Sequence, residues 1–288
     1  MFVLAVIGAA SAQDMPGQLP GTVDAYATGA IGGASLDATD ALGTNSSFSG
    51  LSLEGGASVE YNATATLGFQ ADVRLRYYDH PAPSGLGAYG STDKDFDLAA
   101  HGFYRNGEGL LGGFVQFSGD DNAYTDILYV YRDTFAGVEA QKFIGNATLY
   151  GQLAALHETG TGENPFDGIV GTAEFRYFLT PNLRLDVHGQ VLHQSNVDGF
   201  VDNAALVGIG GEYRLDQSPV SFTASLNYTA FELDNGPGNV FTEHGVRALV
   251  GLKVDFGSAT LEDQDRTGAS LKPILPIFEG DAGHRLLF

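Results

Sequence analysis

The sequence of 288 residues predicts an all-β chain that closes into a transmembrane, antiparallel, up-and-down β-barrel. Segments of about ten residues alternate apolar and polar side chains, which is the period of a strand with two different faces. Short turns alternate with long polar loops, as in barrels that cross a membrane. No interior stretch approaches the roughly 18 apolar residues of a membrane helix, so a chain that spans a membrane would cross it with strands.

The composition narrows the classes of function. Charged residues make up only 17% of the chain, and 40 glycines with 19 Phe and 13 Tyr indicate many turns and many strands. The net charge of −21 argues against a nucleic-acid partner, because phosphates are bound by Lys and Arg. The chain has no cysteine, which excludes disulfides and thiolate metal sites.

The amino terminus, residues 1–12, is interpreted as an export signal. Phe2–Ala10 is apolar, and Ala10-Ser11-Ala12 has the pattern of a cleavage site that would leave Gln13 as the first residue. The basic segment that normally precedes such a run is missing. Either the true start lies upstream of Met1 or this run is a core helix instead.

The strands follow from the alternation. In the segment 183–194, Leu185 and Val187 share one face, whereas Arg184 and Asp186 share the other. The same reading gives twelve strands. They are expected at residues 23–33, 50–61, 65–78, 94–105, 109–118, 132–144, 147–158, 168–179, 183–194, 204–215, 219–231 and 244–257.

The connections support this order. The expected short turns are 62–64, 106–108, 145–146, 180–182 and 216–218, and the expected long loops are 36–48, 80–93, 120–131, 159–167, 196–202 and 233–242. An even number of strands brings both ends of the barrel to the side of the short turns. Fourteen strands is the main alternative, because Ile127–Tyr131 either begins a long strand or forms a separate one.

Two segments resemble the bacterial outer-membrane β-barrel superfamily, including its porin-like members. Tyr177–Leu183 is similar to its periplasmic turns, and Gly251–Phe256 is similar to its carboxyl-terminal assembly signal. The resemblance implies an outer-membrane location with both termini in the periplasm, and outer-membrane lipid and lipopolysaccharide as neighbours. It also implies recognition by the barrel-assembly machinery through Gly251, Val254 and Phe256.

The chain departs from that pattern at its end, because about thirty residues follow the assembly signal. The barrel is therefore assigned to residues 13–257, with its closing strand at 244–257. Residues 258–288 lack periodicity and are interpreted as a flexible periplasmic tail. Alternatively, Leu271–Phe278 folds back and plugs the lumen.

The polar faces of the strands, assigned to the lumen, carry acids and bases in near balance. They either form a paired network that fills the interior or a charged constriction that selects solutes, and these two roles are compatible. The function expected is passive diffusion of small polar solutes, and the alternative is a closed structural barrel that presents its loops to partners. The expected lumen residues are Asp72, Arg74, Arg76, Glu174, Arg176, Arg184, Asp186, Glu212, Arg214 and Arg247.

The outer loops are acidic, which indicates solvated loops or, alternatively, sites for divalent cations that bridge to lipopolysaccharide. No cofactor or resident metal is expected, and the oligomeric state stays open. The loop carboxylates lie at Asp37, Asp40, Asp93, Asp120, Asp121, Asp126, Glu163, Asp167, Asp198, Asp202 and Asp234.

One motif carries nucleophile chemistry. His193-Gln194-Ser195-Asn196 resembles the site of the outer-membrane lipid A 3-O-deacylases, in which the histidine would be the base and the serine the nucleophile. Alternation places His193 and Ser195 on the lipid-facing side. The acid expected to orient the histidine is not placed by the sequence, so the prediction is a protein that is not an enzyme.

Overall fold

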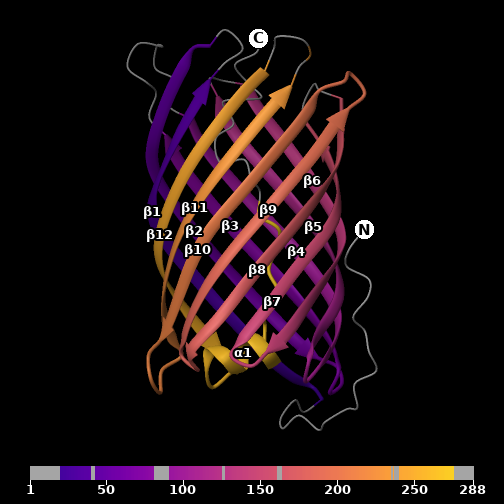
Figure 1. The fold of residues 1–288 in the computed structure, drawn as a ribbon, viewed down its shortest axis with the longest axis vertical. Helices are drawn as coiled ribbons and strands as arrows, with labels where there is room; N and C mark the ends of the chain where they lie inside the picture. The colour runs from indigo at the N-terminus through magenta and orange to yellow at the C-terminus, as the bar shows by residue number, and fades with distance from the viewer. Residues whose placement is uncertain are drawn as a thin grey trace.

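In the computed structural model, the chain is a closed barrel of twelve antiparallel strands (Figure 1). The structure describes residues 20–39, 43–80, 91–124, 127–160, 164–234, 236 and 240–275. Each strand pairs with its neighbours in sequence, and β1 pairs with β12. The elements are β1 Thr22–Thr39, β2 Asn45–Asn62, β3 Leu67–His80, β4 Ser91–Asn106, β5 Gly109–Tyr124, β6 Ile127–Ile144, β7 Ala147–Thr159, β8 Phe166–Thr180, β9 Leu183–Asn196, β10 Val201–Arg214, β11 Val220–Asp234, β12 Val240–Phe256 and α1 Leu261–Thr267.

The sequence alternation becomes an outside and an inside. Val191 of β9 points outward and is 61% exposed, whereas Arg176 of β8 points into the lumen and is 1% exposed. Closure pairs the backbone groups of every strand on both sides, which a sheet in lipid requires. Aromatic side chains point outward near the short turns, as Tyr61, Tyr177 and Phe256 do, which is typical of a membrane interface.

The five short turns lie at one end of the barrel, and α1 lies at that same end (Figure 1). We call it the short-turn end and the opposite one the long-loop end. The turn at Gly145-Asn146 is tight because Gly145 has φ of 54°, a conformation that glycine adopts without strain. The twelve-strand prediction is confirmed.

Strands extend further toward the long-loop end than the side-chain alternation predicts. Residues 127–131 belong to β6, where Asp120 pairs with Tyr131 and Asp121 with Val130. The fourteen-strand alternative is therefore wrong, because Ile127 begins a long strand. Backbone hydrogen bonds between β5 and β6 continue in this region, although its side chains no longer alternate between apolar and polar as those of a membrane-spanning strand do.

The closing strand β12 ends at Phe256, whose register partner on β1 is Ala25. Gly251 lies at a close approach of the two strands, where a Cβ atom would lie 2.5 Å from the carbonyl oxygen of Gly29. Recognition of Gly251, Val254 and Phe256 by the assembly machinery stays a prediction.

The expectation of a flexible periplasmic tail is wrong for residues 258–275. After Phe256 the chain forms α1 beneath the barrel, where Leu261 is buried, and then enters the lumen, where Leu271 and Ile274 are buried. These residues are held in place because side chains of the barrel wall bond to their backbone, and such partners cannot be read from the sequence of the tail itself. Residues 276–288 lie outside the described residues, as does the predicted export signal at residues 1–12.

Among the described residues, the structure has no helix of the length and apolar character needed to cross a membrane.

The closed sheet predicts heat-modifiable migration in gel electrophoresis. Unboiled protein in detergent should keep the paired barrel and migrate as a compact species, faster than the boiled and unfolded chain. Densitometry of boiled and unboiled samples checks this. Equal mobility of the two samples would contradict a closed barrel.

Candidate functional site in the barrel lumen

The chain turns back into the barrel at Gly257. Its φ of 139° favours glycine, and a Cβ atom there would lie 2.5 Å from Oδ2 of Asp24. Asp24 of β1 accepts hydrogen bonds from the Ser258 hydroxyl at 2.6 Å and from the Ala269 amide at 3.0 Å. One carboxylate thus fixes both the start of the turn and the residue at which the chain re-enters the lumen.

The short helix α1 stands under the short-turn end. Thr260 caps it by accepting a hydrogen bond from the Asp263 amide at 3.0 Å. The Glu262 amide donates to the carbonyl oxygen of Pro181 in the β8–β9 turn at 3.1 Å, and Arg266 donates to the carbonyl oxygen of Gly145 in another turn. The helix is therefore attached to two of the short turns.

Residues 268–275, which we call the lumen segment, run extended inside the barrel, and glutamines of the wall bond to their backbone. Gln70 donates to the Leu271 carbonyl oxygen at 2.9 Å and accepts from the Leu271 amide at 3.2 Å. Gln116 does the same with Ile274 at 3.0 and 2.7 Å.

A third glutamine repeats the pattern further along the lumen segment. Gln190 accepts from the Leu275 amide at 3.2 Å and donates to the Leu275 carbonyl oxygen. A carboxamide carries a donor and an acceptor, as a peptide group does, so each glutamine substitutes for a neighbouring strand. We call Gln70, Gln116 and Gln190 the glutamine ladder.

Buried arginines hold the first part of the lumen segment. Arg176 bonds to Asp265 of α1 at 2.6 Å, to the Ser270 carbonyl oxygen at 3.1 Å and to Glu174 at 2.9 Å. Arg105 donates to the Gly268 carbonyl oxygen at 3.0 Å, and its guanidinium also pairs with a wall carboxylate. Both arginines therefore serve the wall and the segment together.

Apolar contacts anchor two side chains of the lumen segment, Leu271 and Ile274. Leu271 packs with Phe103, Leu110 and Tyr150 near the short-turn end. Ile274 joins a larger apolar layer in the long-loop half of the barrel, whose other members belong to the wall. That layer contains Ala38, Phe114, Phe135, Ala154, Leu156, Val170, Leu192, Ala204, Leu206, Phe231, Leu233, Phe241 and Ile274.

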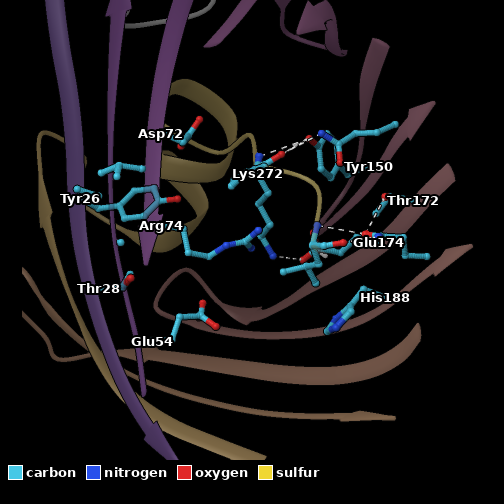
Figure 2. A pocket seen from close by; sticks show the side chains of 17 residues that line it. Tyr26, Thr28, Glu54, Asp72, Arg74, Tyr150, Thr172, Glu174, His188 and Lys272 are labelled. Carbon is cyan, nitrogen blue, oxygen red and sulfur yellow. Dashed lines mark hydrogen bonds and ion pairs between the residues drawn. The ribbon is translucent and has the colours of Figure 1, made fainter. Parts of the chain in front are cut away.

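Between these two contacts, cavities remain around Lys272, which lines all three of them. Their volumes are about 230, 230 and 170 Å³. The Lys272 ammonium lies 2.7 Å from a carboxylate oxygen of Glu174. Figure 2 shows Arg74 and Glu54 on one side of the first cavity, and Glu174 and His188 on the other. We call these three cavities together the chamber, and charges of both signs line it.

All ten predicted lumen residues lie on the inner face of the wall, and the structure pairs them. Arg74 lies 2.7 Å from Asp97, and Arg184 lies 3.1 Å from Glu212. The further pairs are Arg76 with Asp95 at 2.9 Å, Arg247 with Glu54 at 3.5 Å, Arg214 with Asp255 at 3.8 Å, His101 with Asp72 at 3.1 Å and His188 with Asp186 at 3.4 Å. These pairs form one charged wall that the lumen segment contacts.

Sequence reasoning missed the glutamine ladder and the inward apolar layer. The sequence places Gln70 on the polar face beside the charged residues, but it does not indicate which group the side-chain amide binds. Phe135 and Phe231 were missed as lumen residues, because only polar side chains were expected to face the lumen. The apolar Leu271 and Ile274 were the one local sign that the tail is buried.

Other predicted groups lie outside the lumen. His193 and Ser195 are exposed on the outward face of β9 at the long-loop end. Of the loop carboxylates, Asp37 accepts from the Ser47 hydroxyl at 2.5 Å, and Asp40 lies outside the described residues. Within the described ranges, no group of three or more His, Asp or Glu residues is placed to hold a metal ion.

The chain has the fold of bacterial outer-membrane β-barrels. An outer membrane channel from Pseudomonas putida F1 is 14% identical, with a TM-score of 0.55 over 85% of this chain and 100% of that one. The translocator domain of the autotransporter NalP from Neisseria meningitidis is 12% identical, with a TM-score of 0.51 over 82% and 89%. The β domain of the Bordetella autotransporter BrkA is 13% identical, with a TM-score of 0.51 over 81% and 100%.

At these identities the likeness shows the fold alone. No protein-family model matches the chain, and no curated protein matches it.

Removing the carboxylate of Asp265 should weaken the attachment of α1 to the wall. Asp265→Ala leaves Arg176 buried with one partner fewer, at a cost of about 1–3 kcal/mol in the free energy of unfolding. Asp263→Ala is the matched control, because Asp263 is exposed on the same helix, and its effect should stay within about 0.5 kcal/mol. Urea unfolding in detergent, followed by tyrosine fluorescence, measures both. Equal stability of the two variants would contradict the role of Asp265.

Proposed function

We propose that the protein is an outer-membrane channel, porin-like in passing small polar solutes by diffusion, and that its lumen segment closes it. The chamber around Lys272 carries this proposal. Carboxylates and guanidinium groups line the chamber, and they select solutes by size and charge. The fold shared with an outer membrane channel supports this assignment. No enzymatic role of the lumen is proposed.

The lumen segment is suited to be a gate because the backbone pairing of the wall does not depend on it. Each strand bonds to two neighbouring strands, and β1 pairs with β12 without help from residues 258–275. The segment itself is held by side-chain hydrogen bonds, ion pairs and two apolar contacts. A single intramolecular hydrogen bond contributes only about 1 kcal/mol net, since water replaces it. Displacement of the segment would therefore leave an intact barrel.

The proposal includes an orientation. Thr22 begins β1 and Phe256 ends β12 at the short-turn end, where α1 also lies. Outer-membrane barrels have short turns on the periplasmic side. We therefore assign the helix and the entry of the lumen segment to the periplasmic side, from which the gate would be operated.

Two truncations test the channel in planar bilayers. A chain that ends at Gly257 lacks α1 and the lumen segment, and it should give discrete conductance steps several times larger than those of the full chain. A chain that ends at Leu275 is the matched control, because it is shortened from the same end but keeps every described contact of the segment. It should behave as the full chain does.

Heat-modifiable migration verifies that both truncated chains are folded. If the folded chain that ends at Gly257 conducts no more than the full chain, the channel assignment is wrong. The closed structural barrel is then the remaining function for the lumen.

A further inference from the structure

Lys272 of the lumen segment brings a primary ammonium group into the chamber. Its Nζ atom lies 2.7 Å from Oε1 of Glu174, a buried wall carboxylate on β8. Figure 2 shows both residues beside the first cavity. We propose that Glu174 is a binding site for the ammonium group of small organic cations, and that Lys272 occupies this site as a tethered competitor. This inference rests on the proposed channel, because it names the class of solute that the channel admits.

The environment of Lys272 differs from that of a lysine that belongs to the wall. Lys253 of β12 lies 3.0 Å from Glu212 and 3.3 Å from Asp255, and its side chain is 8% exposed. The Lys272 side chain is 42% exposed, and among the described residues its ammonium forms an ion pair with Glu174 alone. An ion pair that solvent reaches contributes little net free energy, so a second ammonium group can replace Lys272.

Glu174 needs a cation in addition to its arginine neighbour. Its Oε2 atom lies 2.9 Å from the Arg176 guanidinium, but that guanidinium also bonds to Asp265 of α1 at 2.6 Å. One guanidinium therefore faces two carboxylates, and Lys272 balances the second of them. When Lys272 leaves, this group keeps a net negative charge in a confined space, which is costly. An incoming ammonium group restores the balance at Oε1, whereas an anion would add to the excess.

The lining of the first cavity favours cations for the same reason. Its charged and imidazole side chains are Glu54, Asp72, Arg74, Glu174, His188 and Lys272. Without Lys272, the carboxylates outnumber the guanidinium of Arg74, which already pairs with Asp97 of the wall at 2.7 Å. Figure 2 shows Glu54 on the opposite side of this cavity from Glu174. The cavity therefore offers a small cation a place between two carboxylates.

The approach to the chamber is acidic as well. The chain has a net charge of −21, and the predicted outer loops carry carboxylates. Glu158 and Asp202 are buried near the long-loop end of the wall, where the Gln194 amide donates to both, at 3.0 and 2.9 Å. A negative field raises the local concentration of cations and lowers that of anions. The entrance and the chamber thus favour the same class of solute.

Binding of such a solute also weakens the gate. The solute and Lys272 compete for one carboxylate oxygen, so a bound solute removes the ion pair that holds Lys272 to the wall. A ligand that binds only after the segment has moved shifts the equilibrium toward the open barrel. The tether gives Lys272 an effective concentration on the order of millimolar, which free solute must match.

Chemical rescue of a lysine deletion tests the site in the full chain. Lys272→Ala should lower the midpoint of urea unfolding in detergent, because Glu174 loses its second cation. Butylammonium carries the ammonium group on a four-carbon chain, as lysine does. It should raise the midpoint of Lys272→Ala by at least half of the loss, with a saturating dependence on concentration. Sodium chloride at the same ionic strength should raise it much less, and the wild type should respond only at higher butylammonium concentrations.

Lys142→Ala is the matched control. Lys142 also has a single carboxylate partner, Glu108 at 2.8 Å, but both side chains are at least half exposed. Butylammonium should shift the midpoint of Lys142→Ala no more than that of the wild type. The double variant Lys272→Ala with Glu174→Gln should not respond, and heat-modifiable migration verifies that each variant is folded. No rise in Lys272→Ala, or an equal rise in Lys142→Ala, would overturn the proposal.

Reversal potentials of the chain that ends at Gly257 test the class of solute. In a gradient of butylammonium chloride, this chain should pass butylammonium in preference to chloride. Glu174→Gln should reduce that preference severalfold, whereas Glu232→Gln, at an exposed position, should leave it unchanged. Equal permeability of the two ions, or a preference for chloride, would overturn the assignment of cations.

The two experiments separate the ammonium site from the channel. Rescue in the full chain, together with a truncated chain that does not conduct, would support the ammonium site and refute the channel. Conductance of the truncated chain without rescue in the full chain would overturn the ammonium site and leave the channel in place.

Discussion

Buried peptide groups need hydrogen-bond partners, and this requirement governs both the wall of the barrel and what fills it. In lipid, only closure of the sheet gives the backbone groups of the edge strands their hydrogen-bond partners. Pairing of β1 with β12 closes the sheet. Inside, an extended segment cannot join a sheet that is already closed. The glutamine ladder resolves this, because Gln70, Gln116 and Gln190 offer side-chain amides to Leu271, Ile274 and Leu275. The lumen segment is thus bound through its backbone as well as its side chains.

Charge and apolar packing divide the interior into layers. Wall arginines and carboxylates are paired around the chamber, which suits a confined space where an unpaired charge is costly. Apolar side chains of the wall pack with Ile274 of the segment in the long-loop half, and α1 lies at the short-turn end. Lys272 brings the segment's own cation into the charged layer, opposite Glu174. The lumen segment thus makes both kinds of contact without being part of the wall.

The twelve strands could be predicted because lipid outside and polar groups inside impose the alternation on each of them. Segments at the long-loop end, such as 127–131, escape that constraint, so the sequence left open whether Ile127 begins a long strand or a separate one. The buried tail could be predicted only as an alternative, from the apolar Leu271–Phe278, because residues 258–275 bond to strands from all round the barrel and so have no local period. Asn203 was missed for a related reason. The sequence shows no acid that would bond to His193, and in the structure its partner is an amide across the β9–β10 hairpin.

The central claim is that the lumen segment lies inside the folded barrel, and cysteine accessibility measures this directly. The chain has no cysteine of its own, so Ser270→Cys gives a single thiol at a position that is 8% exposed. Val197→Cys, at a position 85% exposed, is the control. In the folded protein, a polar maleimide should label Val197→Cys rapidly and Ser270→Cys only after heat unfolding. Equal labelling rates in the folded state would contradict the account.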